Sequence, residues 1–227
     1  MTDPHEKTRA AAPAVERHGD VLRRLGGVRY TDDIKRPGML HGKILRCPHP
    51  HARIRSVDAS AALAMEGVHA VITGADMPRR FGIIPWTPDE YPLALEVARF
   101  VGDGVAAVAA VDERTANLAL RKIAVDYEVL PFVTDPHDAL ARPEIGVGRK
   151  GDNISKVDEL EFGDVDAALA ESDVVSEADY YFEGTAHAPI EMHCAIGEVD
   201  KEGFLTVWSA TQVPHYVHRE LSRVLDV

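Results

Sequence analysis

Cysteine and long apolar runs are scarce in this 227-residue sequence. The only cysteines, Cys47 and Cys194, lie far apart and form no disulfide framework, so a reducing cytoplasm is the expected location. The first twenty residues are polar and lack the apolar segment of a secretory signal. The longest apolar run, GVAAVAAV at 104–111, is too short to cross a bilayer. These absences predict a soluble protein without a membrane partner.

The sequence also lacks the short motifs of several common enzyme classes. No GxGxxG, Walker loop, GxSxG or HExxH occurs, and no complete catalytic constellation is apparent, so no catalytic residue is predicted in this chain. Lysine and arginine total 25 against 37 aspartates and glutamates, a formal charge of -12. The summed field of such a chain repels phosphate, which argues against a nucleic-acid partner.

The regular part of the sequence predicts one domain over residues 21–135, after a loose arm at 1–20. Asp58 is placed to cap a helix that Gly67 ends, and Asp112 to cap a helix over 113–123. The apolar run at 104–111 is typical of a strand buried on both faces. Strand, helix and strand in succession indicate a mixed α/β unit. The expected strands cover residues 39–47, 52–58, 68–73, 104–111 and 124–131.

A polar, turn-rich stretch at 136–158 is interpreted as a linker to a second region, 159–227. There Asp164 is expected to cap a helix, residues 174–184 to be extended, and Gly203 to form the turn of a hairpin. A final helix starts at Pro214, with Val217, Leu221, Val224 and Leu225 on one face. The aromatic residues of the expected strands, Tyr180, Tyr181 and Trp208, are predicted to be core.

The segment CPHPH at 47–51 raises the question of a metal site. Thiolates and imidazoles are preferred ligands of zinc and copper, and His49 and His51 share a face of an extended chain. A second cluster, HAPIEMHC, contains His187, Glu191, His193 and Cys194, but Pro189 opposes the helix that would align the first two. The favoured interpretation is that His49 and His51 make hydrogen bonds at a strand entrance, and no metal site is predicted.

Five stretches in order over about 200 residues resemble the N-terminal part of the molybdopterin-binding subunit of the xanthine dehydrogenase/aldehyde oxidase family. They are GGVRYTDDIKRPGMLHGKILRCPHPHARIRSVDAS, GVHAVITGADMP, ARFVGDGVAAVAAVDERTANLALRKIAVDYEVLP, HAPIEMHCAIGEVD and LTVWSATQVPHYVHRELSRVL. The resemblance implies an α+β fold: an α/β-hammerhead domain followed by the beginning of a molybdopterin-binding domain. It also implies that CPHPH is structural, with Cys47 where serine is usual. Two stretches, FGIIPWTPDEYPLA and TQVPHYVHREL, look closest to 4-hydroxybenzoyl-CoA reductase.

The resemblance also implies roles for particular residues. Gln212 matches the glutamine whose side-chain amide approaches the oxo ligand of molybdenum. An amide suits this position because it stabilises charge on the oxygen without itself titrating. The alternative role for Gln212 is helix capping. Glu191 matches a recurring acidic position without assigned chemistry, and an ionic contact with the hairpin is equally consistent. Trp86 and Tyr91 are candidates for a loop that contacts substrate in the access funnel.

The implied activity is that of a molybdenum hydroxylase-type oxidoreductase acting on an aromatic, heterocyclic, aldehyde or aryl-CoA substrate. The implied cofactors are molybdopterin shared with a partner chain, and [2Fe–2S] clusters and FAD on iron-sulfur and flavin subunits. The glycine-rich GGGFGG loop and the general-base glutamate of the family are not in this sequence, so the chain is expected to be inactive alone, as a split-gene product or a truncated subunit. The alternatives are a reductive dehydroxylase or hydratase at the same cofactor, a non-catalytic assembly module, and a small zinc protein.

Overall fold

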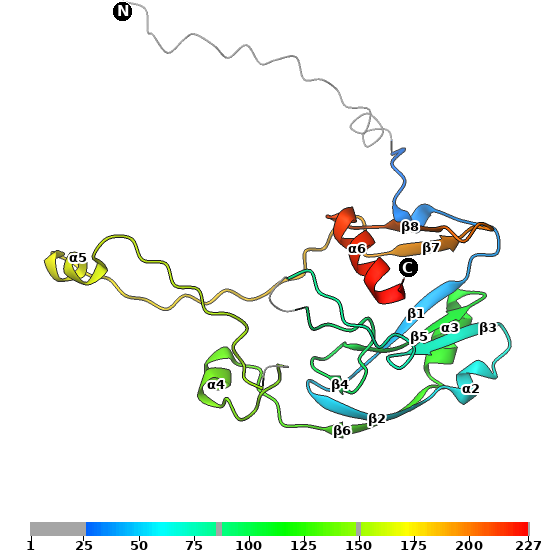
Figure 1. Ribbon diagram of the computed structural model, residues 1–227, viewed down its shortest axis with the longest axis horizontal. Helices are drawn as coiled ribbons and strands as arrows, with labels where there is room; N and C mark the ends of the chain where they lie inside the picture. Colours follow the sequence, from blue (N-terminus) through cyan, green and yellow to red (C-terminus); the bar gives the residue numbers. More distant parts are fainter. Residues whose placement is uncertain (1–25, 85–87, 149–150, 227) are drawn as a thin grey trace, which may run out of the picture. The chain divides into compact units, whose positions relative to one another are not determined.

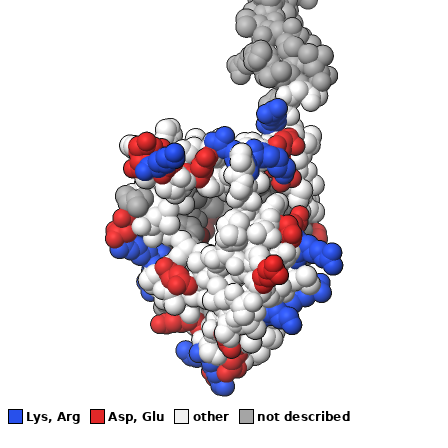
Figure 2. All heavy atoms as spheres, turned by 90° about the vertical axis from the view of Figure 1, so that its right-hand side faces the viewer, with Lys and Arg blue, Asp and Glu red and all other residues white. Residues whose placement is uncertain are grey.

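The computed structural model describes residues 26–84, 88–148 and 151–226. They form two compact units, one made of residues 26–36 with 187–212, the other of the described residues between 37 and 186 with 213–226. No helix in the described ranges is long and apolar enough to cross a membrane. On the face drawn in Figure 2, basic and acidic side chains alternate rather than gather by sign.

The larger unit contains two three-stranded antiparallel sheets (Figure 1). In the first, β5 (Gly104–Ala110) lies between β1 (His41–Arg46) and β3 (Val68–Thr73). In the second, β2 (Ala52–Asp58) lies between β4 (Val97–Ala98) and β6 (Ala124–Val129). Strands β5 and β6, which come before and after the helix at Glu113–Leu120, therefore belong to different sheets.

The core of the larger unit forms where α3 (Glu113–Leu120) packs on the first sheet (Figure 1). Small side chains, Ala106 and Ala110 from β5 and Ala116 and Ala119 from α3, are fully buried there. Val105 points to the opposite side of β5 and joins a second cluster. Because successive residues of a strand face opposite sides, β5 contributes to both clusters, as its apolar run predicts.

Local signals in the sequence account for how these elements begin and end. Strands β2 and β3 have the predicted bounds. Asp112 is the N-cap of α3, where its carboxylate accepts a hydrogen bond from Thr115 N at 2.6 Å. The short helix α2 (Ser60–Leu63) has Ala59 and not the predicted Asp58 as its N-cap, although Asp58 Oδ1 accepts a hydrogen bond from Ser60 N at 2.9 Å. The helix ends at Leu63, before the predicted Gly67, which has a φ of 82°, a conformation that glycine adopts without strain.

The smaller unit is built on the predicted hairpin, β7 (Ala195–Val199) and β8 (Leu205–Ser209). Gly203 in the connecting turn has a φ of 89°. The 3-10 helix η1 (Thr31–Asp33) contacts β7. The predicted turn is thus confirmed, and a segment near the N-terminus joins the hairpin across more than 150 residues of sequence.

Three further helices follow the first sheets in the chain. The range predicted as a linker contains α4 (Pro136–Ala141), and α5 (Val165–Glu171) begins with Asp164 accepting from Ala167 N at 2.9 Å. Helix α6 (Pro214–Leu225) starts at the predicted proline. No helix or strand is assigned between α5 and β7, and residues 154–190 are all exposed.

The prediction that Tyr180 and Tyr181 are core residues is wrong for the described structure, because both side chains are exposed. Trp208, predicted with them, lies half-buried on β8.

Candidate functional site

Gln212 occupies the short connection between β8 and α6 and is exposed. The N-cap of α6 is Val213, whose side chain makes no capping hydrogen bond. Gln212 therefore lies one residue before the N-cap position. Gln212 is also the only glutamine in the sequence, so its carboxamide is a chemically unique group in this chain.

The hairpin of the smaller unit holds the chain up to Gln212 in a fixed path. Ser209 at the end of β8 pairs with Ala195, and Ala210 N donates to Cys194 O at 3.1 Å beyond the last strand pair. Pairing therefore continues to within two residues of Gln212. The backbone that leads to Gln212 is thus anchored to the hairpin, while the side chain itself is exposed.

Arg36 ties the N-terminal segment to the same hairpin. Its Nη2 lies 2.6 Å from Glu198 Oε2, and its guanidinium carbon lies 4.8 Å from the ring centroid of Trp208. The charged partners are nearly half exposed, so the ion pair alone contributes little. The ring contact adds to it, since guanidinium groups bind aromatic faces. Together they orient Trp208, four residues before Gln212.

Glu191 is bound to the N-terminal segment by hydrogen bonds. Its Oε1 accepts from the backbone N of Thr31 at 3.1 Å and from Thr31 Oγ1 at 3.2 Å. Thr31 is buried, with 7% of its surface exposed. The contact is with η1 and not with the hairpin, so Glu191 joins the two segments of the smaller unit. This structural role is not the ionic hairpin contact that the sequence suggested.

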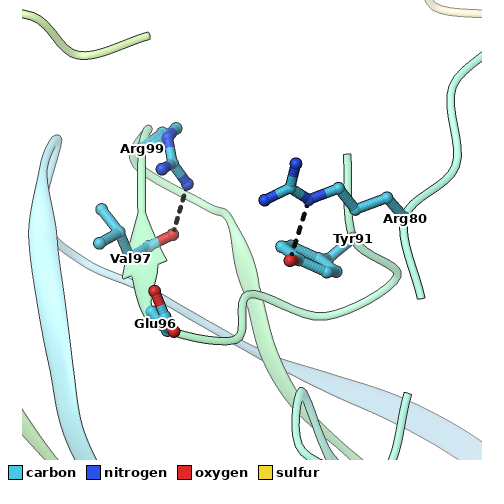
Figure 3. A pocket seen from close by; sticks show the side chains of 5 residues that line it. All are labelled: Arg80, Tyr91, Glu96, Val97 and Arg99. Atoms are coloured by element: carbon cyan, nitrogen blue, oxygen red, sulfur yellow. Dashed lines mark hydrogen bonds between the residues drawn. The ribbon is translucent and has the colours of Figure 1, made fainter. Parts of the chain in front are cut away.

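Tyr91 lines a small polar cavity of about 160 Å³ in the larger unit (Figure 3). Arg80 Nε donates to Tyr91 Oη at 3.0 Å, and this hydrogen bond raises the pKa of Arg80. Arg99 lies across the cavity, with its Nη1 donating to Val97 O at 3.1 Å. Glu96 is the acidic residue in the lining. Two guanidinium groups beside a phenol suit a ligand with an anionic or hydrogen-bond-accepting group.

The other funnel candidate, Trp86, lies outside the described residues. The two arginines of the cavity were not singled out from the sequence. Arg80 and Arg99 are 19 positions apart in chain order, and only the folded loop brings them to one cavity. The doublet RR at 79–80, next to the candidate loop, was the available signal.

The CPHPH segment is held by contacts within the larger unit. Cys47 is 1% exposed, and its backbone N donates to Asp103 O at 2.8 Å. His49 packs edge-on against Tyr127, with ring centroids 5.3 Å apart, and His51 Nδ1 lies 2.8 Å from Pro131 O. Burial, and secondarily Cys47, raises the pKa of Tyr127. The hydrogen-bonding interpretation of His51 is confirmed, while His49 makes a ring contact.

The second histidine-containing cluster is open to solvent: His187 and His193 are exposed, and Cys194 is half-buried. Within the described ranges, no three His, Cys, Asp or Glu side chains are grouped closely enough to hold a metal ion.

Helix α6 forms one wall of an apolar groove of about 260 Å³ in the larger unit. Val217, Leu221 and Val224, three of the four residues predicted on its apolar face, line the groove. Glu220 interrupts this face and is 6% exposed. Its carboxylate accepts hydrogen bonds from Arg219, Arg223 and, at 3.4 Å, from Gly82 N. The hydrogen bond from Arg219 lowers the pKa of Glu220 most, so the buried carboxylate fastens α6 to the loop after β3.

Two sequence families match this chain. Residues 25–131 match the aldehyde oxidase and xanthine dehydrogenase a/b hammerhead domain, and residues 148–227 match the molybdopterin cofactor-binding domain. The antiparallel sheets and helix of the larger unit are thus a hammerhead domain, and the expected α+β fold is confirmed.

Individual relatives agree with these matches. The chain is 37% identical over 204 residues to a probable xanthine dehydrogenase subunit of Bacillus subtilis, covering 89% of this chain and 27% of the relative. It is 38% identical over 204 residues to the nicotinate dehydrogenase large molybdopterin subunit of Eubacterium barkeri, covering 88% and 47%. Its structure resembles the aldehyde oxidoreductase from Desulfovibrio gigas with a TM-score of 0.80, 27% identity, and coverage of 93% and 25%.

This chain is therefore a homologue of the large, molybdopterin-binding subunits of the xanthine dehydrogenase family, which are subunits of molybdenum-dependent oxidoreductases. It carries the hammerhead domain and a part of the molybdopterin-binding domain. The chain spans between about a quarter and a half of the length of the relatives described above.

Proposed function

We propose that this chain supplies the N-terminal part of the molybdenum site of a hydroxylase-type oxidoreductase, with Gln212 as its cofactor-contacting residue. The observation that carries the proposal is the place of Gln212: an exposed carboxamide just after the paired hairpin, with Val213 rather than Gln212 as the N-cap of α6. It lies in the part of the chain that matches the molybdopterin cofactor-binding domain.

The residues present fit a molybdopterin group because the carboxamide of Gln212 is a neutral donor next to a rigid strand end. When bound, the molybdenum cofactor supplies the redox chemistry. Gln212 would donate a hydrogen bond to an oxygen of the bound group. A carboxamide does not titrate near neutral pH, so this stabilisation is independent of pH over the working range. Hairpin pairing at Ala195 and Ser209 keeps the donor in place and reduces its reorganisation.

The cavity at Tyr91 is the proposed point of substrate contact. A substrate with an anionic or carbonyl substituent would accept hydrogen bonds from Arg80 and Arg99, and Tyr91 would stack against an aromatic ring. These groups favour an aromatic or heterocyclic acid, an aldehyde or an aryl-CoA. Electrons from the reaction would leave through [2Fe–2S] clusters to FAD on partner subunits, while the remaining molybdopterin-binding polypeptide completes the site.

The test compares turnover per bound molybdenum in the assembled complex for wild type, Gln212→Ala and Gln212→Glu. Loss of one positioned donor at a reacting centre lowers turnover by about tenfold or more, and both variants lose it. Lys201→Ala in the exposed hairpin turn serves as the matched surface change and should leave turnover unaltered. Unchanged turnover in both Gln212 variants would support a non-catalytic assembly module instead.

A narrower assignment, reductive dehydroxylation of an aryl-CoA as in 4-hydroxybenzoyl-CoA reductase, rests on the stretches FGIIPWTPDEYPLA and TQVPHYVHREL. The assembled complex distinguishes it by direction. A reductase consumes a reduced electron donor only when a hydroxylated aryl-CoA is present, whereas a hydroxylase reduces an electron acceptor in the presence of its substrate. A hydratase would do neither and would add water without net redox change.

A further inference from the structure

Residues 174–183, VVSEADYYFE, form an exposed segment in which the charged residues keep to alternate positions, which Val175 and Tyr181 also share. Its even positions carry only apolar or small side chains: Val174, Ser176, Ala178, Tyr180 and Phe182. Its odd positions carry every charged residue of the segment: Glu177, Asp179 and Glu183. A period of two places each set on one face of an extended chain. The pattern is therefore that of a strand with one buried and one solvated face.

The conformation of the segment agrees with this pattern. Tyr181 Oη donates to Glu183 Oε2 at 2.7 Å, a contact between residues two apart that an extended backbone brings to the same face. No helix or strand is assigned to these residues. Tyr180 and Phe182, on the apolar face, are 94% and 87% exposed. An apolar face of this kind is a binding surface when it is contiguous.

Among the described residues of the matched molybdopterin-binding region, no hydrophobic side chain is buried, so none forms a core against that face. Every buried hydrophobic side chain in the described ranges lies between Cys47 and Ile123, in the hammerhead domain. Residues 148–227 match only part of what the longer relatives contain, since the chain spans 27% of the Bacillus subtilis relative. The polypeptide that carries the remainder of this domain is the occupant that these facts favour.

We propose that residues 174–183 add as a β-strand to a sheet of the polypeptide that carries the remainder of the molybdopterin-binding domain, with Val174, Tyr180 and Phe182 facing its core. Main-chain hydrogen bonds would give the affinity and the alternate side chains the specificity, as in other strand additions. The acidic face, with Glu177 and Glu183, stays in solvent. This proposal rests on the proposed function and names the surface through which the site is assembled.

Two neighbouring pairs of identical residues make the test sharp. Val174 and Val175 are expected on opposite faces, and so are Tyr180 and Tyr181, of which Tyr181 also donates a hydrogen bond to Glu183. The probe is the Bacillus subtilis relative from which the 204 matched residues have been deleted, and the measurement is its dissociation constant for the intact chain. Val174→Asp and Tyr180→Asp should each weaken binding at least about 100-fold. Val175→Asp and Tyr181→Asp should weaken it less than about fivefold.

Amide hydrogen exchange gives a second readout on the same samples. The backbone amides of 174–183 should exchange rapidly in the free chain and slowly in the complex. The proposal would be overturned if the Asp variants on both faces lost equal affinity, or if the wild-type chain did not bind. It would also be overturned if the exchange of these amides were the same in the free chain and in the complex. A chain that dimerises by itself, and loses the dimer with Tyr180→Asp, would assign the surface to a second copy and overturn it as well. Gln212→Ala leaves this binding intact, so loss of turnover and loss of assembly are separable.

Discussion

Gly74 in the hammerhead domain has almost no room for an added side-chain atom. A Cβ at Gly74 would lie 2.5 Å from Ala94 O and 2.7 Å from Leu95 Cα, where ordinary contact begins near 3.4 Å. The neighbouring atoms are backbone and cannot rotate away. Ala94 is buried, and its N donates to Gly104 O at 2.7 Å, which fixes it to β5. Gly74→Ala therefore forces a separation of almost 1 Å between two held segments.

Overpacking of this kind costs about 2–3 kcal/mol. For a chain of this size each kcal/mol lowers Tm by roughly 2–4 °C, so Gly74→Ala should lower it by roughly 4–12 °C. The assay is thermal unfolding followed by circular dichroism. The matched control is Gly42→Ala in β1, where nothing lies within 4 Å of the new Cβ and where reduced freedom of the unfolded chain predicts no loss of stability. Equal Tm values for Gly74→Ala and wild type would refute the reasoning.

Three further substitutions test individual contacts. Asp112→Ala removes the cap that accepts from Thr115 N and should lower the Tm, with Asp112→Asn close to wild type; equal losses of Tm would rule out the cap. Glu220→Gln removes the charge that binds Arg219 and Arg223 and should lower the free energy of unfolding near neutral pH. The loss should be only about 1 kcal/mol because both arginines are half exposed. The pKa of Glu220 is lowered from 4.5. The stability difference between wild type and Glu220→Gln should therefore disappear as the pH falls below 4.5 and through the lowered pKa. A stability difference that persists in acid would contradict the contact with Arg219. Because the pKa of Tyr127 is raised from 10.0, alkaline absorbance titration should show one tyrosine ionising well above the others, and Tyr127→Phe should remove it; no late component would mean that the ring is solvated.

Features that depend on neighbouring residues in the chain could be predicted from the sequence. Asp112 and Asp164 cap helices because their side chains reach amides three residues on. Gly67 and Gly203 mark turns because each has a positive φ. The resemblance to the molybdopterin-binding subunits drew on the order of stretches along the whole chain, and the two domain matches confirm it.

Features that depend on long-range contacts could not be predicted in this way. The partner of Glu191 is Thr31, 160 residues away, and no local pattern indicates that pairing. The placement of β5 and β6 in different sheets is likewise set by which strands lie beside them. The pattern around Tyr180 and Tyr181 predicted an extended segment with core aromatic residues, but burial also requires a surface to pack against, and both side chains are exposed.

The most direct test of the account is whether the Gln212 carboxamide contacts the bound cofactor. Because Gln212 is the only glutamine, labelling this chain with ¹⁵N-glutamine gives a single side-chain amide pair, and an unlabelled partner adds none. The account predicts that this pair shifts and exchanges more slowly when the assembled complex contains the molybdenum cofactor than when it does not. Identical side-chain amide signals in the two states would contradict the assignment of Gln212 to the cofactor site.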